Sequence, residues 1–457
     1  MVRRRLSSIL VLGLAAVILP LVLMVQPVLA FCGFYVAKAD SSLYNQASQV
    51  IIARDGNRNV LTMANDYQGD VQDFALVVPV PVILTEEQVN VGEPRIIERL
   101  NAYSAPRLVE YFDSNPCDPP VMEMMQDAVP ASPPSAAMRQ KASNEALGVT
   151  VEEQFSVGEY DILILSAKES QGLTTWLTQN GYQLPQGANS VLGAYIKQNL
   201  KFFVAKVNLK KFDRQGFQQL RPLMMAFESP RFMLPIRLGM VNAEGAQDLL
   251  VYLLTPNGAA EITNYRTVRI PSNVEIPEFV QGEFNDFYKA LFDTSYTREG
   301  KKVAFLEYAW NMANCDPCAA NPLSPEELTQ AGVFWLDATP SDIAPPGRRM
   351  PRPTSNVFIT RLHVRYPPDK FPEDLRFQTT ANQDLFQGRY VLRRPYRGEM
   401  TCRAADAYRQ NTRQRQRQEA ETLAKLTNWS LPEIESKIDW LDGPNDPIPW
   451  WRRLWPR

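Results

Sequence analysis

The sequence contains a single histidine, His363, among 457 residues. Histidine-based metal centres are therefore excluded within this chain, and a Ser-His-Asp arrangement would depend on that one side chain. His363 lies on an alternating segment with Arg361 and Arg365, so it shares a strand face with two cations. We therefore expect a surface residue there rather than a catalytic base.

The signature motifs of several enzyme classes are also missing. The chain has no Gly-x-Ser-x-Gly, no phosphate-loop signature, no Gly-x-Gly-x-x-Gly and no His-Glu-x-x-His. A structural zinc site would need four Cys or His ligands in paired spacing, and only one such pair occurs. We therefore expect no cofactor and no metal centre.

Neither a surplus of basic residues nor a second long apolar run is present. Residues 1–30 hold three arginines and no acids, so the rest of the chain carries 45 Lys and Arg against 50 Asp and Glu. This balance argues against nucleic acid as a partner. No stretch after residue 30 reaches the roughly 18 uninterrupted apolar residues of a membrane helix, so membrane contact by the cleaved chain would be peripheral.

The first thirty residues have the composition of a secretory signal peptide. Three arginines at positions 3–5 precede an apolar run from Ile9 to Val25, and Val28-Leu29-Ala30 is the small-residue pattern of a cleavage site. We expect cleavage after Ala30 and an exported protein, periplasmic or secreted. Phe31 before Cys32 does not fit a lipoprotein acceptor. The alternative is an uncleaved N-terminal anchor, because the apolar run is at the short end of what spans a bilayer.

Five cysteines would enter an oxidising compartment if the chain is exported. Two disulfides and one remaining thiol are the simplest arrangement, with fifteen possible ways to choose the pairs. We favour Cys315 with Cys318 and, second, Cys117 with Cys402.

The Cys315-Asp316-Pro317-Cys318 segment could also be a redox dithiol or half of a metal site. The acidic neighbour Asp316 would raise the thiol pKa and weaken the nucleophile. A structural disulfide is therefore the preferred interpretation.

Proline, at 36 residues, outnumbers glycine, at 22, which indicates many rigid turns and linkers. Together with alternating strand and helix patterns, this predicts an α+β protein with two lobes of mixed sheet and helix. The expected divisions are a β-rich lobe at 31–127, a linker at 128–146, an α+β lobe at 147–337, a Pro/Arg-rich loop at 338–356, a closing strand region at 357–402 and a helical, Trp/Arg-rich extension at 403–457.

Local patterns predict individual elements. A hairpin is expected around Asp55-Gly56-Asn57, because β-rich runs flank an Asp-Gly turn. Ser324 and Ser430 each precede a helix with N-terminal capping residues. Expected strands are 74–80, 149–157, 160–166, 202–209, 223–228, 232–240, 249–254, 333–336 and 357–366. Expected helices are 93–103, 106–112, 169–180, 191–199 and 403–426, the last solvated along most of its surface apart from a stripe at Tyr408, Leu423 and Leu426.

An ordered series of short motifs runs along the first half of the chain. The motifs are Cys32-Gly33-Phe34-Tyr35, residues 65–70 (NDYQGD), residues 73–81 (DFALVVPVP), residues 157–161 (VGEYD) and residues 176–182 (WLTQNGY). In this order they resemble the bacterial domain of unknown function 2330 family, over about residues 31–258 and onward to the strand near Tyr366. The resemblance implies an exported bacterial protein and supplies no activity.

Two further features have competing interpretations. Asp66, Asp70 and Asp73 are weak candidates for a hard cation, but they lack calcium-loop spacing, so a polar turn is preferred. The tail carries indole and guanidinium side chains that suit a membrane interface or an anionic envelope polymer, although they could instead pack back onto the protein. These residues are Trp450, Trp451, Arg452, Arg453 and Trp455.

These observations favour an exported cell-envelope protein that is a non-catalytic binding or structural module stabilised by disulfides, and they favour this over an enzyme. Its partner would be an envelope component or membrane surface reached through the C-terminal extension. The alternative is an extracytoplasmic enzyme, either a thiol-disulfide oxidoreductase using Cys315 and Cys318 or a carboxylate-dependent hydrolase using residues such as Asp66 and Asp70.

Overall fold

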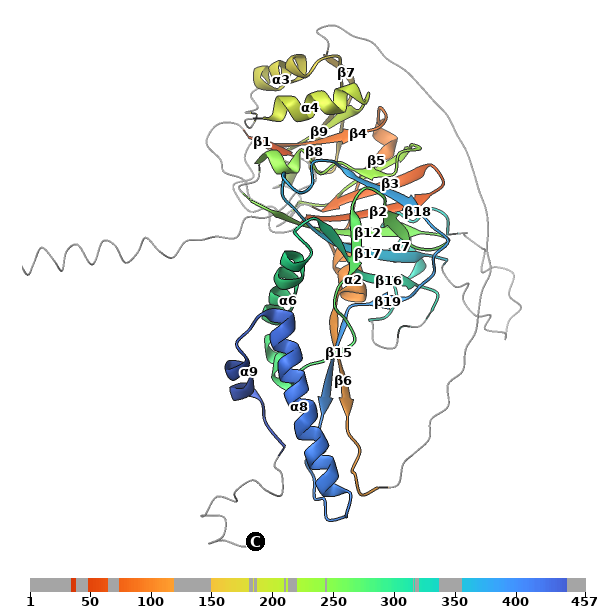
Figure 1. The fold of residues 1–457 in the computed structure, drawn as a ribbon. Coiled ribbons are helices and arrows are strands. Elements are labelled where there is room, and N and C mark those ends of the chain that lie inside the picture. Colours follow the sequence, from red (N-terminus) through yellow and green to blue (C-terminus); the bar gives the residue numbers. More distant parts are fainter. Residues whose placement is uncertain are drawn as a thin grey trace, which may run out of the picture.

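The computed structural model describes residues 34–37, 48–64, 74–118, 149–180, 184, 187–208, 211–212, 220–242, 245–314, 316, 320–336 and 356–441. Two large sheets form its body (Figure 1). The five-stranded sheet is antiparallel throughout. Its strand order is β1 (Phe34–Ala37), β4 (Phe74–Val80), β9 (Lys201–Val207), β8 (Tyr160–Ala167) and β7 (Val149–Val157).

The larger sheet has nine strands, and parallel pairs occur only at β14·β16 and β12·β2. Its order is β14 (Arg266–Arg269), β16 (Val303–Asn311), β17 (Phe358–Tyr366), β12 (Gln247–Thr255), β2 (Ser48–Asp55), β3 (Arg58–Ala64), β10 (Leu223–Glu228) and β5 (Val89–Val91), with β19 (Phe386–Gln387) beside β16. A small sheet of β11 (Met233–Leu234), β18 (Leu375–Thr379) and β13 (Ala260–Ile262) accompanies it.

The main hydrophobic core lies between the two large sheets. It contains Val78 of β4 and Ile162 of β8 together with Val251 of β12 and Leu362 of β17, all of them buried. Alternation along each strand sends every second side chain into this core, and apolar burial contributes about 25 cal/mol per Å². The body is therefore a sandwich whose two sheets stabilise each other.

Helices cover the outer faces of both sheets. Those packed on the five-stranded sheet are α3 (Ser170–Gln179) and α4 (Ala188–Lys197). Those packed on the nine-stranded sheet are α2 (Pro94–Ser104) and α7 (Pro325–Gln330). Short 3-10 helices lie at η2 (Glu86–Gln88), η3 (Gly239–Asn242) and η4 (Glu278–Glu283).

A narrow arm projects from the body, and we call it the stalk (Figure 1). It consists of the parallel sheet β15 (Val274–Glu275), β20 (Arg389–Arg394) and β6 (Arg107–Phe112) and the helices α8 (Ala405–Thr427) and α9 (Leu431–Lys437). The helix α6 (Phe284–Arg298) packs against α8. A separate cluster of buried side chains, including Phe287, Tyr390 and Leu423, holds these elements together.

The α+β class and many of the expected elements are confirmed. The hairpin turns at Gly56, whose φ of 56° lies in the left-handed region that glycine enters without a Cβ clash. Ser324 caps α7 with a complete capping box, and Ser430 precedes α9. The long helix expected near residue 403 is α8, but its buried side includes Thr412 and other polar side chains as well as apolar ones.

The helix expected at residues 106–112 is wrong. That segment is strand β6, which pairs with β20 along its full length, from Arg107↔Arg389 to Phe112↔Arg394. Alternation and helical periodicity are hard to distinguish over so short a run, and pairing with a distant strand decided the outcome.

Two expected strands are also wrong. The segment 232–240 contains only the short strand β11, because Pro235 has no N–H and the amides of Ile236 and Arg237 donate to the Asp374 carboxylate. The segment 333–336 forms no strand, since the Val333 amide donates instead to a carbonyl in α7.

Strands from both sides of the expected linker pair within the same sheets, for example β4 with β9 and β2 with β12. The linker at 128–146 lies outside the described residues, as does the loop at 338–356 except for its last residue. The proposed domain boundaries stay predictions.

Candidate functional site

A polar pocket of about 480 Å³ lies in the stalk, between the ends of β6 and β20 and the first half of α8. Its lining comes from three segments, the first of which is far from the other two in the sequence. The lining residues are Phe112, Asp113, Ser114, Arg393, Tyr408, Asn411, Thr412 and Arg415. We call this the stalk pocket.

Local structure explains how these side chains meet. Parallel pairing sets Phe112 opposite Arg394, and the Asp113 amide extends the ladder by donating to the Arg394 carbonyl at 2.9 Å. On α8, Tyr408, Thr412 and Arg415 are spaced four and three residues apart, so they share one helix face. The sheet and the helix thus present one wall each.

The Asp113 carboxylate organises the charges of the pocket. Its side chain is 11 % exposed, and its Oδ2 accepts a hydrogen bond from the Tyr408 hydroxyl at 2.8 Å. The same oxygen lies 2.8 Å from Nη2 of Arg415, and Oδ1 lies 3.7 Å from Nη1 of Arg393. Burial and the Asp113 carboxylate both raise the pKa of Tyr408. Asp113 is therefore surrounded by donors, which suits a positioning role better than proton transfer.

The rim of the pocket combines guanidinium groups with exposed aromatic rings. Arg393 lies 5.7 Å from the ring centroid of Tyr111, and Arg394 lies 6.0 Å from that of Phe112. Tyr111 is 44 % exposed and Phe112 is 71 % exposed. Exposed rings beside cations offer both apolar contact and charge to a partner.

Behind the pocket, Glu419 of α8 is a buried acid. Its Oε1 lies 3.3 Å from Nε of Arg415. Burial raises its pKa to about 7, Glu275 and Glu278 add to that rise, and Arg415 opposes it. The charge of this carboxyl group therefore changes near neutral pH.

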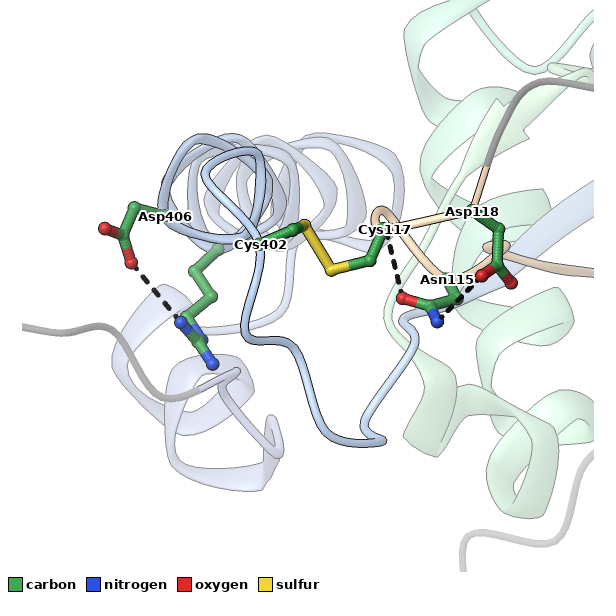
Figure 2. The surroundings of a disulfide bond; sticks show 6 residues. Asn115, Cys117, Asp118, Cys402 and Asp406 are labelled. Atoms are coloured by element: carbon green, nitrogen blue, oxygen red, sulfur yellow. Dashed lines mark hydrogen bonds and ion pairs between the residues drawn. A yellow bond between two sulfur atoms is a disulfide. The ribbon is translucent and has the colours of Figure 1, made fainter.

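A disulfide joins Cys117, beyond β6, to Cys402, just before α8 (Figure 2). The two cysteines are 285 residues apart in the sequence, and their Cα atoms lie 5.6 Å apart. Asn115 shapes the turn on one side by accepting from the Cys117 amide at 3.0 Å. This is one of the two pairings expected from the sequence, and it ties the two walls of the stalk pocket together.

Several residues singled out from the sequence lie outside the described part of the chain. They are Cys32, Asp66, Asp70, Asp73, Cys315, Cys318, Trp450, Trp451, Arg452, Arg453 and Trp455. Between the two cysteines of the Cys-x-x-Cys segment, Asp316 is described, and its carboxylate accepts from Tyr308 at 3.0 Å and from Gln387 at 2.8 Å.

The expectation that His363 is a surface residue is wrong. Its side chain is 13 % exposed and stacks on Phe292 with ring centroids 3.8 Å apart. Nδ1 lies 2.9 Å from Oε1 of Glu307, and Nε2 lies 2.9 Å from Oδ1 of Asp248. Arg361, His363 and Arg365 do share one face of β17, as predicted. However, α6 covers this face at His363, and acids on β16 and β12 neutralise the cations.

Burial lowers the pKa of His363, but the carboxylates of Glu307 and Asp248 outweigh that effect and raise it to about 9. Arg361, which is 5 % exposed, pairs with Glu307 at 2.6 Å, and Arg365 pairs with Asp248 at 2.8 Å. We call these five residues the buried ion network. None of them lines the stalk pocket, and their mutual pairing indicates a structural role.

Within the described residues, no group of three or more His, Cys, Asp or Glu side chains is arranged to hold a metal ion. In the same part of the chain, no helix is both long and apolar enough to cross a membrane. The polar lining of the stalk pocket offers hydrogen bonding and charge pairing.

Sequence reasoning found Tyr408 only as part of an apolar stripe and missed Asp113, Arg393 and Arg415. The one available signal was the Cys117–Cys402 pairing, which brings the two ends of the pocket together.

Comparison with known proteins identifies the family of the chain. A family model described as uncharacterized protein conserved in bacteria (DUF2330) matches residues 26–378, more than half of the chain. No curated protein and no solved structure matches the chain significantly.

Proposed function

Since the chain belongs to the DUF2330 family of uncharacterized bacterial proteins, we propose that it is an exported cell-envelope protein whose stalk binds an acidic envelope component. The observation that carries this proposal is the Cys117–Cys402 disulfide beside the stalk pocket. Disulfides persist in oxidising compartments and are rare in the bacterial cytoplasm. The signal-peptide pattern of residues 1–30 supports the same localisation.

The chemistry of the stalk supports a binding role. Arg393 stays 36 % exposed although it pairs with Glu275, so part of its guanidinium is accessible to a carboxylate. Tyr111 and Phe112 add exposed apolar surface next to it. Asn411 and Thr412 supply polar atoms inside the pocket. An acidic polymer with some apolar surface would match this combination of groups.

Export is tested by the intact mass of the protein recovered from fractionated cells, with thiol alkylation before and after reduction. The proposal expects a chain that lacks residues 1–30 and in which Cys117 and Cys402 are alkylated only after reduction. Recovery of a full-length, fully alkylatable chain from the cytoplasm would overturn it.

Binding is tested by retention of the protein in washed cell envelopes. The double variant Phe112→Ala/Arg393→Gln should be retained several-fold less than the native protein. Arg376→Gln is the matched control, because Arg376 is 63 % exposed and lies on β18, outside the stalk. Equal retention of all three proteins, with unchanged circular dichroism, would remove the stalk from the proposal.

A further inference from the structure

A second cavity, of about 280 Å³, lies at one end of the nine-stranded sheet and shares no lining residue with the stalk pocket. The β2–β3 turn, the loop after β12 and the end of β18 enclose it. The lining residues are Arg54, Asp55, Gly56, Thr255, Pro256, Asn257, Gly258, Thr379, Thr380 and Ala381. We call it the Arg54 cavity.

Arg54 lines the cavity and is buried, with only 6 % of its surface exposed. Its Nη1 donates to Oδ1 of Asn59 at 2.7 Å and to the Ser229 carbonyl at 3.2 Å. The guanidinium also lies 4.8 Å from the ring centroid of Phe232. Within the described residues, Nε and Nη2 donate no hydrogen bond, and no carboxylate pairs with this cation.

Arg361 has the carboxylate partner that Arg54 lacks among the described residues. Arg361 is equally buried, but it pairs with Glu307 at 2.6 Å. A buried charge is costly unless it is paired and hydrogen-bonded. Burial accordingly lowers the pKa of Arg54, and among the residues that the structure describes no acid offsets that effect. Two neutral acceptors and one aromatic ring compensate the charge only in part.

The walls of the cavity are held in place by hydrogen bonds between its loops. The Ala259 amide donates to the Asn382 carbonyl at 2.7 Å, and the Thr380 hydroxyl donates to the Ala259 carbonyl at 2.7 Å. Gly258 permits this approach, since a Cβ there would lie 2.6 Å from the Asn382 carbonyl oxygen. The cavity is therefore preformed, as small-molecule sites usually are.

We propose that the Arg54 cavity binds the carboxylate group of a small molecule. The planar guanidinium keeps two donors, Nε and Nη2, that match the two oxygens of a carboxylate. Thr379 also lines the cavity and adds a hydroxyl group. With about 30 Å³ for each water in the liquid, the cavity has room for roughly nine waters, or a molecule of about amino-acid size.

The charge of the cavity selects a carboxylate over a phosphate. Arg54 is its one buried cation, and the Asp55 carboxylate also lines it, although Asp55 pairs with Arg58 at 3.9 Å. Because Asp55 and Arg58 compensate each other, the cavity keeps the single positive charge of Arg54. That charge neutralises one carboxylate but leaves one charge of a phosphate dianion uncompensated.

The test is isothermal titration of the full exported chain with sodium acetate, and separately with inorganic phosphate at equal ionic strength. Saturable acetate binding is expected, at least tenfold tighter than phosphate binding. Arg54→Gln should weaken acetate binding at least tenfold, and Arg54→Lys should give an intermediate loss because lysine lacks the planar pair of donors.

Two further variants keep the result interpretable. Ala381→Leu, at an exposed lining position, should narrow the cavity and reduce affinity without touching Arg54. Arg266→Gln, at a position 61 % exposed and outside the cavity, should bind acetate like the native protein. Three results would each overturn the proposal. They are the absence of saturable acetate binding by the native chain, tighter binding of phosphate than of acetate, and acetate affinities of folded Arg54→Lys and Ala381→Leu that equal the native affinity.

Discussion

His363 and Glu307 face each other on neighbouring strands, with Nδ1 of the imidazole 2.9 Å from Oε1 of the carboxylate. Glu307 is fully buried and sits where the register of β16 against β17 shifts. A bulge re-aims the side chain at the point where it occurs. Here it lets a single carboxylate contact His363 and Arg361 together.

This contact makes stability depend on pH in a defined direction. The pKa of His363 is about 9 in the folded protein against 6.5 for the free side chain. Its contribution is therefore fully present below about pH 6.5 and is lost as the pH rises through 9. We expect urea denaturation to show a loss on the order of 3 kcal/mol between pH 6 and pH 9.5. His363→Gln should flatten that part of the profile, and a parallel decline in both proteins would contradict the assignment.

Removing one member of the buried ion network should lower the free energy of unfolding more than removing an interacting pair. Arg361→Met leaves the Glu307 charge buried without this partner, so unfolding should become easier by about 3 to 5 kcal/mol. The double variant Arg361→Met/Glu307→Leu should recover a large part of that loss. Arg365→Met is the matched control at a more exposed position, 22 % exposed, and should lose less. Chemical denaturation of the native protein and these three variants checks the expected order of stabilities. A double variant no more stable than Arg361→Met would contradict the prediction.

Glu419 makes stability depend on pH in the same direction, but in a lower pH range. Burial raises its pKa to about 7 from 4.5, so the folded protein favours the protonated acid. That contribution is present below about pH 4.5 and is lost as the pH rises through 7. Glu419→Gln keeps the shape without the charge and should stabilise the protein by about 1 to 3 kcal/mol at pH 8, with little change at pH 5. Thermal unfolding at both pH values decides it; equal destabilisation at both would instead show that the ion pair with Arg415 dominates.

The disulfide should stabilise the stalk in particular. Cys117→Ser/Cys402→Ser is expected to lose about 2 to 4 kcal/mol, because a cross-link restricts the unfolded chain. Hydrogen exchange should accelerate at the start of α8 and at the end of β6, while β12 and β17 stay protected. Ser114→Ala, a neighbouring change that leaves the cross-link intact, serves as control. Uniform acceleration across both sheets would contradict a stalk-specific role.

Much of the local structure could be predicted because its causes lie within a few residues. Asp55-Gly56 predicted the β2–β3 hairpin, and Ser324 with Glu327 predicted the start of α7. The stalk pocket could not be predicted in this way. Asp113, Arg393 and Arg415 lie on three segments, and no short pattern records that they meet.

The sequence by itself determined the family, the α+β class, the turns and the helix starts, because glycine, proline and capping residues act on their own backbone. Tertiary structure decided that 107–112 is a strand, since β20 supplies its hydrogen bonds. It also decided that His363 is a largely buried cation and that Arg54 is a buried cation with no acid paired to it in the described part of the chain. Charge states of this kind depend on what packs against a side chain, and that is set by segments far away along the chain.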